Sequence, residues 1–419
     1  MPSAKTNAGA SSGTEFDILV VGNGHAGATA AIALRQHGFT GSLGLLGEER
    51  GLPYERPPLS KEYLAGAKNA EQLLIRPAAF WDERSVAMLT GRRAVALDPA
   101  TRTVTDAEGA TLRYGTLVWA AGGRARRLDC HGNHLDGVHV VRTRADVDRI
   151  AADLPRVTHV VVVGGGYIGL EAASVLTKAG KHVTVLEAQE RVLARVAGEA
   201  LSSFYATEHR RRGVDVRVGA TVVAVEGDTR ATGVVLADGT VLPADMVVVG
   251  IGIVPNVEPL LAAGASPGST GVQVDAECRT SLADVYAVGD CAAQINPHGP
   301  GRVIRIESVG NAHDQAQIAA RNIVGLDMRS DAVPWFWSDQ YDLRLQTVGL
   351  SLDHDDAVVR GDPAERSFSV VYLRGDRVIA LDCVNAARDF VQGRKLILSA
   401  AAPDRDRLAD PSVRLADLA

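Results

Sequence analysis

The sequence predicts an α/β protein with two mainly parallel sheets and a smaller α+β unit at its C-terminal end. Three observations lead to this prediction. Two apolar, β-branched runs, at residues 17–21 and 159–163, each lead into a glycine-rich turn and then a helical stretch. A parallel strand buried on both faces has this continuous apolar character. From about residue 330 the pattern changes to short β-rich segments separated by turns.

Length and composition limit the classes of protein. A chain of 419 residues has room for two or three domains, and 46% hydrophobic with 22% charged residues is typical of a globular enzyme. The net charge of -6 gives no general basic excess for nucleic acid. No apolar run reaches membrane-spanning length. We therefore expect a cytoplasmic protein that binds neither nucleic acid nor membrane, with a disordered N-terminus at 1–15.

The first glycine-rich turn has the spacing of a dinucleotide site. The run "DILVV" leads directly to Gly22, Gly24 and Gly27, and an alanine-rich helical stretch follows. The first glycine permits a tight turn, the second allows backbone to approach a pyrophosphate, and the third allows helix and strand to pack closely. The next predicted strand ends on Glu48, where an acid can bind ribose hydroxyls.

The second turn repeats each part. "HVVVV" leads to Gly164, Gly166 and Gly169, and the strand after the helix ends on Glu187. A carboxylate here accepts hydrogen bonds from an adenosine ribose and repels a 2′-phosphate, which favours NADH over NADPH. The nearby Arg195 weakens this preference, as does Arg191, because arginine can bind that phosphate. Two such Rossmann-like sites in one chain indicate two cofactors that exchange electrons.

Three further segments fit this arrangement. Residues 116–128 and 245–256 each predict a strand followed by a glycine turn, and residues 284–292 predict a strand followed by Gly289 and Asp290. Short hairpin-rich stretches with Asp-Gly or Glu-Gly turns precede them. As a set, these motifs resemble the two-dinucleotide-domain flavoprotein reductases related to glutathione reductase.

Narrower motifs resemble one branch of that superfamily. "YERPPLSKEYLAG", "GGGYIGLE", "RIESVGNA" and "PWFWSDQY" are similar to the NADH-dependent ferredoxin reductases of bacterial oxygenase systems, of the putidaredoxin reductase type. The resemblance implies bound FAD, exchangeable NADH and a 2Fe-2S ferredoxin as electron acceptor. It implies an FAD-binding domain formed by 16–125 and 254–329, an inserted NADH-binding domain at 126–253, and a C-terminal interface domain at 330–419.

The resemblance also assigns site residues by matching motifs, and no metal ligands. "AAGGR" departs from the family pattern, because Ala121 has no hydroxyl. The residues implied for FAD are Gly22, Gly24, Ala26, Gly27, Glu48, Lys61, Ala94, Arg142, Asp290, Val309 and Trp337. Those implied for NADH are Gly164, Gly166, Tyr167, Gly169, Glu187, Arg195 and Gly252.

Two of these positions are candidates for chemistry. A reduced flavin is anionic or nearly so, and Lys61 is the candidate cation beside it. Glu171, expected in the first turn of the second helix, is its candidate partner and a candidate ligand of the nicotinamide carboxamide. The alternatives are a solvated loop lysine and an acid that complements a helix N-terminus. Tyr167 either covers the flavin face or packs against its neighbours.

The cysteines exclude one mechanism of the superfamily. Cys130, Cys278, Cys291 and Cys383 form no close pair, and residues 51–61, where disulfide reductases carry their dithiol, contain none. Electrons must therefore leave directly from a flavin, which accepts two as a hydride and releases them singly.

The C-terminal part predicts a small α+β domain over the flavin. "DLRLQTVGL", "DAVVRG" and "FSVVYLRGDRVIALDCVN" are strand-like, with "RGD" as a hairpin turn, and a helix follows over roughly 385–400. The last stretch, with Pro403 and Pro411, is expected to be loose. Trp337 lies either near the flavin edge or among ordinary core aromatics.

The expected partner surface is basic, because ferredoxins of this kind are usually acidic. The candidate contacts are Arg76, Arg344, Arg394 and Lys395. Gln317 and Gln346 stand where the putidaredoxin reductase type has basic residues, which indicates a different partner surface. The resemblance suggests a monomer or weak dimer. The alternatives left open are a rubredoxin, quinone or radical as acceptor, and a binding module like apoptosis-inducing factor.

Overall fold

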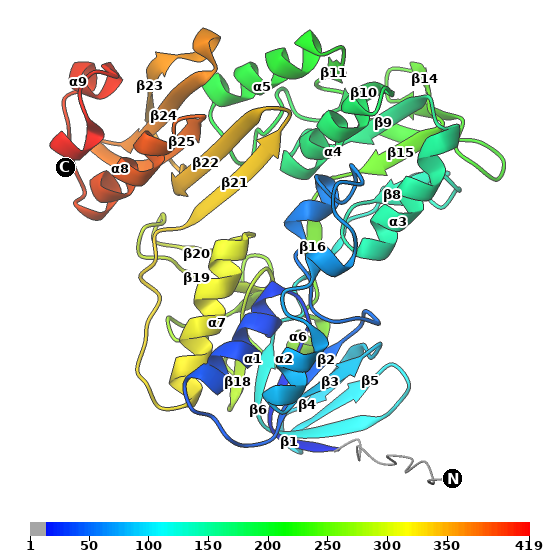
Figure 1. The fold of residues 1–419 in the computed structure, drawn as a ribbon, viewed down its shortest axis with the longest axis vertical. Helices are drawn as coiled ribbons and strands as arrows, with labels where there is room; N and C mark the ends of the chain where they lie inside the picture. The colour runs from blue at the N-terminus through cyan, green and yellow to red at the C-terminus, as the bar shows by residue number, and fades with distance from the viewer. Residues whose placement is uncertain (1–13) are drawn as a thin grey trace, which may run out of the picture.

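The computed structural model describes residues 14–419, so the N-terminal segment expected to be disordered lies almost wholly outside the described residues. Figure 1 shows two parallel-sheet units, one above the other, with an antiparallel sheet beside the upper one. The first strand begins at Glu15, which therefore belongs to the fold and not to the lead-in. The α/β class and the additional C-terminal domain are confirmed.

The lower unit is built on a sheet whose order is β3-β2-β1-β6-β5-β4, with β18 paired to β6. Strands β1, β2, β3, β6 and β18 run parallel, and β4 and β5 form an antiparallel extension. Helix α1 packs against α7, which comes from far along the chain. The elements are β1 (Glu15–Val21), α1 (His25–Gln36), β2 (Leu43–Gly47), α2 (Ala78–Glu83), β3 (Val86–Thr90), β4 (Ala94–Asp98), β5 (Thr103–Asp106), β6 (Thr111–Trp119), β18 (Val285–Ala287) and α7 (Val309–Ile323).

The upper unit has an all-parallel sheet of order β11-β10-β9-β15-β8. A three-stranded antiparallel sheet, β12-β13-β14, adjoins it and contains the predicted Asp238-Gly239 turn. The elements are β8 (Val138–Val140), α3 (Arg144–Asp153), β9 (His159–Val163), α4 (Tyr167–Lys178), β10 (His182–Leu186), α5 (Glu199–Arg211), β11 (Asp215–Arg217), β12 (Val222–Glu226), β13 (Gly233–Leu236), β14 (Val241–Pro243) and β15 (Met246–Val249).

Two antiparallel strands connect the units. The chain passes upward through β7 (Gly123–Ala125) and returns through β16 (Ile253–Pro255), and these two strands pair with each other. The upper unit is thus inserted between two parts of the lower one. The returning chain adds α6 (Glu258–Ala262), β17 (Val272–Gln273), β19 (Ala292–Ile295) and β20 (Val303–Arg305).

The C-terminal unit is a five-stranded antiparallel sheet of order β21-β22-β25-β24-β23, with α8 on one face. Its other face packs on the upper unit, where Phe368 contacts Phe204 of α5 with ring centroids 4.9 Å apart. The predicted turn at Gly375 joins β24 and β25. The elements are β21 (Trp335–Gln340), β22 (Leu343–Gly349), β23 (Asp356–Asp362), β24 (Ser367–Arg374), β25 (Arg377–Val384), α8 (Ala387–Leu398) and α9 (Arg405–Ala409).

The prediction of a loose C-terminal stretch is wrong. Residues after 403 form α9 and a final 3-10 turn, in which Leu408 and Leu415 are fully buried. The buried guanidinium of Arg360 donates hydrogen bonds to the carbonyls of Leu408, Asp410 and Val413. A tail with two prolines is therefore held by one distant arginine, a contact that local sequence does not reveal. Within the described residues, no helix is long and apolar enough to cross a membrane.

Candidate functional site

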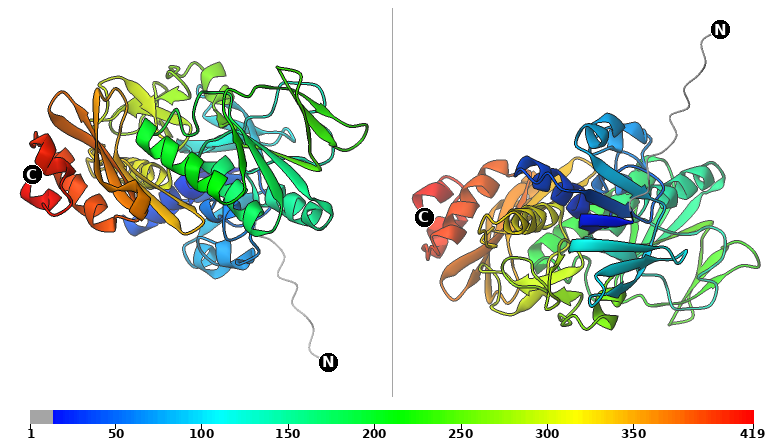
Figure 2. Two further views of the ribbon diagram at one scale, coloured as in Figure 1. Left: turned by 90° about the horizontal axis from the view of Figure 1, so that it is seen from above. Right: turned by 90° about the horizontal axis from the view of Figure 1, so that it is seen from below.

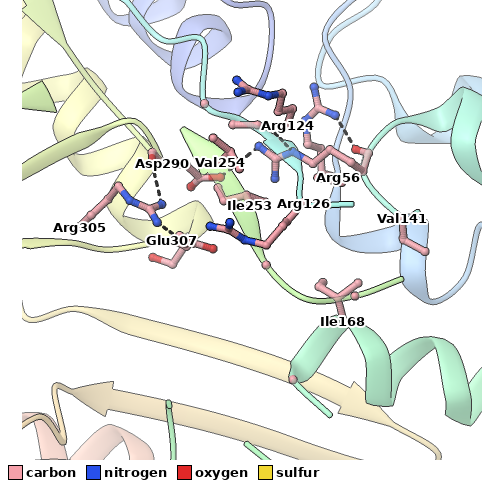
Figure 3. A pocket seen from close by; sticks show the side chains of 18 of the residues that line it. Arg56, Arg124, Arg126, Val141, Ile168, Ile253, Val254, Asp290, Arg305 and Glu307 are labelled. Carbon is pink, nitrogen blue, oxygen red and sulfur yellow. Dashed lines mark hydrogen bonds and ion pairs between the residues drawn. The ribbon is translucent and has the colours of Figure 1, made fainter. Parts of the chain in front are cut away.

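A large cavity lies where the two parallel-sheet units and the C-terminal sheet meet. Its volume is about 2120 Å³, roughly twice the largest usual size of a small-ligand pocket. Segments from all three units line it, including both glycine turns, β7, β16 and β21. Figure 3 shows arginines from several elements pointing into this space. The cavity therefore has room for two dinucleotides.

The first glycine turn can be built only with glycine. Gly22 has a φ of +112°, and a Cβ there would lie 2.2 Å from the Ala120 carbonyl oxygen. A Cβ on Gly27 would lie 1.7 Å from the Gly22 carbonyl oxygen. Helix α1 begins after Gly24 with neither a side-chain cap nor an acid in its first turn. Its free N–H groups suit the pyrophosphate of a bound FAD.

The second turn repeats this geometry. Gly164 has a φ of +111°, and a Cβ there would lie 2.4 Å from the Gly250 carbonyl oxygen. A Cβ on Gly169 would lie 2.0 Å from the Gly164 carbonyl oxygen. Helix α4 begins after Gly166, again without a side-chain cap or an early acid. The donors of this turn fit a second pyrophosphate.

The two candidate ribose acids differ in their surroundings. Glu48 follows β2, is 68% exposed and lies 3.8 Å from Arg93. Glu187 follows β10, and its carboxylate accepts hydrogen bonds from the backbone N–H groups of Gly165 and Gln189, at 2.8 and 2.9 Å. These two contacts fix the Glu187 side chain at the edge of the cavity.

The neighbouring arginines also differ from each other. Arg191 donates to Ala197, Ala194 and Ser202, at 2.6 to 3.1 Å, so its guanidinium is occupied by the protein. Arg195 lines the cavity opposite Gly252, where a Cβ would lie 3.5 Å from its Nη2.

A frame of arginines surrounds the first turn. Arg56 pairs with Glu49 at 2.7 Å and donates to the Arg142 carbonyl at 2.7 Å. Arg142 in turn lies 3.2 Å from the Asp290 carboxylate. These pairs join the loop after β2, the loop before α3 and the segment after β18. The result is a wall of paired arginines and carboxylates, whose guanidinium groups are candidates to bind phosphates.

Sequence reasoning missed several residues of this wall. Arg56, Arg124, Arg126 and Arg305 all line the cavity (Figure 3). Each lies inside one of the sequence motifs described above, within "YERPP", "GGRAR" or "RIES". Basic residues beside a glycine turn were the available signal, because phosphates require nearby cations.

Lys61 and Glu171 form an ion pair of 2.7 Å, with side chains that are 12% and 1% exposed. The Glu171 carboxylate also accepts hydrogen bonds from the hydroxyls of Ser60 and Ser338, both at 2.6 Å. Burial raises the pKa of Glu171, and the charge and hydrogen bond of Lys61, with the two serines, offset only part of this effect. The pair lines the same cavity as the two glycine turns.

The expected position of Glu171 within its helix is wrong. Helix α4 begins at Tyr167, so Glu171 lies in the second turn, and the first turn has no acid. The carboxylate therefore does not complement the helix N-terminus. Lys61 is likewise not a solvated loop lysine, because a short 3-10 helix (Pro57–Ser60) directs its side chain to Glu171.

The aromatic candidates lie on β21 and at the start of α4. Tyr167 packs on Phe336 with ring centroids 4.6 Å apart, and it also lines the cavity. Trp337 stacks on Trp335 at 5.5 Å and lines the cavity from the other face of β21. Both aromatic side chains therefore combine packing with a position at the cavity wall.

The structure gathers nearly all of the expected cofactor residues around one cavity. Gly27 and Gly169 are the exceptions, and they lie beneath it, where helix meets strand. The four candidate partner contacts are exposed. Arg76 lies before α2, Arg344 lies on β22, and Arg394 and Lys395 both lie on α8. The residues that line the cavity are Gly22, Gly24, Ala26, Glu48, Lys61, Ala94, Arg142, Gly164, Gly166, Tyr167, Glu171, Glu187, Arg195, Gly252, Asp290, Val309 and Trp337.

Comparison with known families agrees with this geometry. The family model described as pyridine nucleotide-disulphide oxidoreductase matches residues 16–316, and one described as reductase C-terminal matches residues 335–419. The chain belongs to the pyridine nucleotide-disulphide oxidoreductase family, whose members are FAD-dependent and use NAD(P)H. All four of its cysteines are free, so it lacks the disulfide for which the family is named.

Individual relatives narrow the class. The chain is 58% identical to the ferredoxin reductase subunit of 5,5'-dehydrodivanillate O-demethylase from Sphingobium sp., over 96% of this chain and 98% of that one. It is 56% identical to a ferredoxin–NAD(P)+ reductase from Sphingomonas sp., over 96% and 97%. It also resembles the reductase in a covalent putidaredoxin reductase–putidaredoxin complex, with a TM-score of 0.92, 40% identity and coverage of 96% and 97%. The resemblance to ferredoxin reductases is confirmed.

Proposed function

We propose that this chain is an FAD-dependent oxidoreductase that takes a hydride from NADH and passes electrons singly to a 2Fe-2S ferredoxin serving an oxygenase. One observation carries the proposal. Two uncapped glycine turns face one cavity, with the buried Lys61–Glu171 pair between them and no cysteine beside them. The net reaction is NADH plus two oxidised ferredoxins, giving NAD+, two reduced ferredoxins and one proton. The similarity to ferredoxin reductases of oxygenase systems supports the proposal.

The residues of the cavity have separate tasks. When bound, FAD supplies the two-electron to one-electron conversion. The first turn and the arginine frame would hold its phosphates, and Asp290 would accept a hydrogen bond from its ribityl chain. Lys61 keeps a positive charge at the cavity wall, and Glu171 holds its ammonium in place. This charge compensates the negative charge that arrives with a hydride.

The preference for NADH over NADPH follows from Glu187 and Arg191. Glu187 is fixed by two backbone donors and presents a carboxylate where the adenosine ribose would bind. Arg191 is occupied by three protein acceptors and is not free for a 2′-phosphate. Arg195 remains at the cavity wall, so the proposed discrimination is strong but not absolute.

A stopped-flow experiment tests the function. The yellow holoenzyme is mixed with NADH or with NADPH, and oxidised 2Fe-2S ferredoxin is then added. Fast bleaching by NADH followed by ferredoxin-dependent turnover is expected. A stable reduced complex that does not turn over would indicate a binding module instead. Turnover only with rubredoxin, a quinone or a radical would refute the ferredoxin assignment.

We propose α8 as the main docking element for the ferredoxin. Arg394 and Lys395 lie on this helix beside Val391 and Leu398, whose side chains are 66% and 56% exposed. An apolar centre with basic neighbours suits a small acidic protein. Arg76, before α2, and Arg344, on β22, are further candidate contacts in the proposal.

Charge reversal at Arg394 tests this surface. R394E is expected to lower kcat/KM for ferredoxin about tenfold at low salt and less at high salt, because screening removes the steering. NADH-dependent bleaching should not change. R113E, on an exposed position of β6, is the matched control. Equal losses in both variants would contradict the assignment.

Three finer points belong to the same proposal. The domain division is FAD-binding at 16–125 and 254–329, NADH-binding at 126–253 and partner-binding at 330–419. Lys61 and Glu171 are the residues placed beside the reacting atoms. A cytoplasmic location and a monomeric or weakly dimeric state stay predictions.

A further inference from the structure

A continuous chain of hydrogen bonds leads from the Lys61–Glu171 pair along the inner face of β21 to His209 of α5. Ser338 Oγ contacts Glu171 Oε1 at 2.6 Å, and Gln340 Nε2 contacts Ser338 Oγ at 3.2 Å. Gln340 Oε1 then contacts Nε2 of His209 at 2.9 Å. Ser338, Gln340 and His209 have no exposed surface. The chain crosses from α4 to β21 and then to α5, two of which belong to the upper unit.

The pattern of β21 explains this arrangement. Residues alternate between the faces of a strand, so Phe336, Ser338 and Gln340 share the face toward the upper unit. Trp335 and Trp337 occupy the other face and stack on each other. Ser338 and Gln340 of "PWFWSDQY" are thus buried against α4 and α5. None of the roles proposed for the cavity residues uses this polar face.

If Glu171 is ionised, every bond in the chain takes one direction. Glu171 can only accept when ionised, so the Ser338 hydroxyl donates to it. Ser338 must then accept from the amide NH₂ of Gln340, whose carbonyl oxygen accepts from His209. His209 therefore carries its proton on Nε2. Burial lowers the pKa of His209 to about 4, so the ring is neutral and its Nδ1 accepts from the Tyr341 hydroxyl at 3.1 Å. Every donor points toward the carboxylate.

We propose that Ser338, Gln340 and His209 form a directed hydrogen-bond chain that holds Glu171 ionised against Lys61, which makes His209 a positioning residue for this pair. Aligned donors polarise one another, so a distant member stabilises the charge at the end of the chain. Burial alone would favour a neutral Glu171 and a freer Lys61 ammonium. The proposed role deepens the function above and rests on it.

Other charged groups face the two ends of the chain. At the histidine end lie Glu208 and Arg212 of the same helix, and Arg212 lies over the Tyr341 ring at 4.4 Å. Arg366 reaches Glu208 from the C-terminal sheet, at 3.0 Å. At the carboxylate end Lys61 lies closest, and the phenols of Tyr167 and Tyr205 lie near it. Lys61 is the cation in hydrogen-bond contact with Glu171.

The first test reads the direction of the chain without any enzyme assay. The holoenzyme is labelled with nitrogen-15 in histidine, and the His209 signals are those missing from H209Q. NMR should show a neutral ring protonated on Nε2 throughout the neutral pH range. A proton on Nδ1, or a cationic ring, would reverse or break the chain and overturn the proposal. This result does not depend on whether ferredoxin is the acceptor.

The second test reads the charge of Glu171. With carbon-13 at the glutamate side-chain carboxyl, the Glu171 signal is the one missing from E171Q. Removing the hydroxyl in S338A should raise its pKa by about one unit, and H209L by about half a unit. H209Q restores a donor at the position of Nε2 and should return the titration toward wild type.

A destabilised control separates this role from a structural one. His139 is also a buried histidine, but it pairs with Asp153 beneath the other end of the upper sheet. H139L should lower the urea midpoint as H209L does and leave the Glu171 titration unchanged. The same Glu171 pKa in wild type and H209L would overturn the proposal. A shift of that pKa in H139L as large as the shift in H209L would also overturn it.

Discussion

The two glycine turns of this protein have the same local geometry and different surroundings. Their first glycines have φ values of +112° and +111°, and a Cβ on the third glycine would lie 1.7 or 2.0 Å from the carbonyl oxygen of the first. Around the first turn, a Cβ on Gly24 would meet Arg56 at 3.7 Å, and one on Gly289 would meet Ala26 at 3.0 Å. Around the second, nothing lies within 4 Å of such an atom on Gly166.

This difference teaches what the motif does and does not specify. The turn provides free N–H groups and a close backbone approach in both places. The segment that returns after β18, with α7, encloses the first turn (Figure 1). At the second turn, β21 packs on Tyr167 through Phe336, and the space beside Gly166 stays open. The motif therefore specifies a dinucleotide site, and the difference in enclosure supports the proposed assignment of a resident FAD to the first turn and an exchanging NADH to the second.

The largest expected effect comes from filling the two turns. G27A places a methyl group 1.7 Å from a carbonyl oxygen, and G169A does so at 2.0 Å, so backbone must move in both. We expect each to lose about 2–3 kcal/mol of stability. G27A should be purified without flavin. G169A should retain flavin and lose most NADH-dependent bleaching.

Flavin content by absorbance and NADH bleaching by stopped flow distinguish the two variants. G180A, at a helix end with open space around it, is the control for a glycine outside the turns, although its φ of +77° adds some strain. Flavin loss in both turn variants would show that the two sites are not separable.

A smaller effect is expected from one buried acid in each unit. Asp106 accepts from Arg92 at 2.6 Å in the lower unit, and Asp153 contacts His139 and Arg230 at 2.9 and 3.0 Å in the upper. Burial raises the pKa of both carboxyls, but these donors outweigh it and hold each pKa below 3.8. Such stabilisation is complete above the unfolded pKa and is lost as pH falls through the folded one.

D106N and D153N should therefore each cost about 2 kcal/mol at neutral pH, and this cost should shrink only as pH falls through the folded pKa, which lies below 3.8. Urea unfolding at neutral pH and at a pH below the folded pKa checks this. Flavin release reports on the lower unit, and far-ultraviolet circular dichroism reports on the whole chain. A constant loss across the pH range would refute the charge-based explanation.

The smallest effect is expected from the two ribose acids. E187Q removes a fixed carboxylate, so KM for NADH should rise about tenfold, or about 1.4 kcal/mol, and the preference over NADPH should fall. E48Q removes a carboxylate that is 68% exposed and should weaken flavin retention only slightly. Steady-state kinetics with both nucleotides measure the first, and flavin release on dilution measures the second. An unchanged nucleotide preference in E187Q would contradict the role of Glu187.

Some features followed from local sequence because their cause is local. Gly22 and Gly164 need positive φ in a turn directly after a strand, so spacing alone identified them. Glu48 and Glu187 each follow the next strand after a glycine turn, so their places at the cavity were also predictable. Glu171 was assigned to the wrong turn because helix α4 begins at Tyr167 and has no polar cap to mark its start.

Other features depended on chain segments far apart. Arg360 holds the C-terminal tail from another strand, Ser338 contacts Glu171 from the C-terminal unit, and His209 joins them through Gln340. The sequence by itself determined two dinucleotide turns, the absence of a redox dithiol and the C-terminal sheet, because strand periodicity and glycine geometry are short-range. Only the tertiary structure decided which arginines surround the phosphates and which polar groups support Lys61, because buried charges take their partners from whichever segments folding brings beside them.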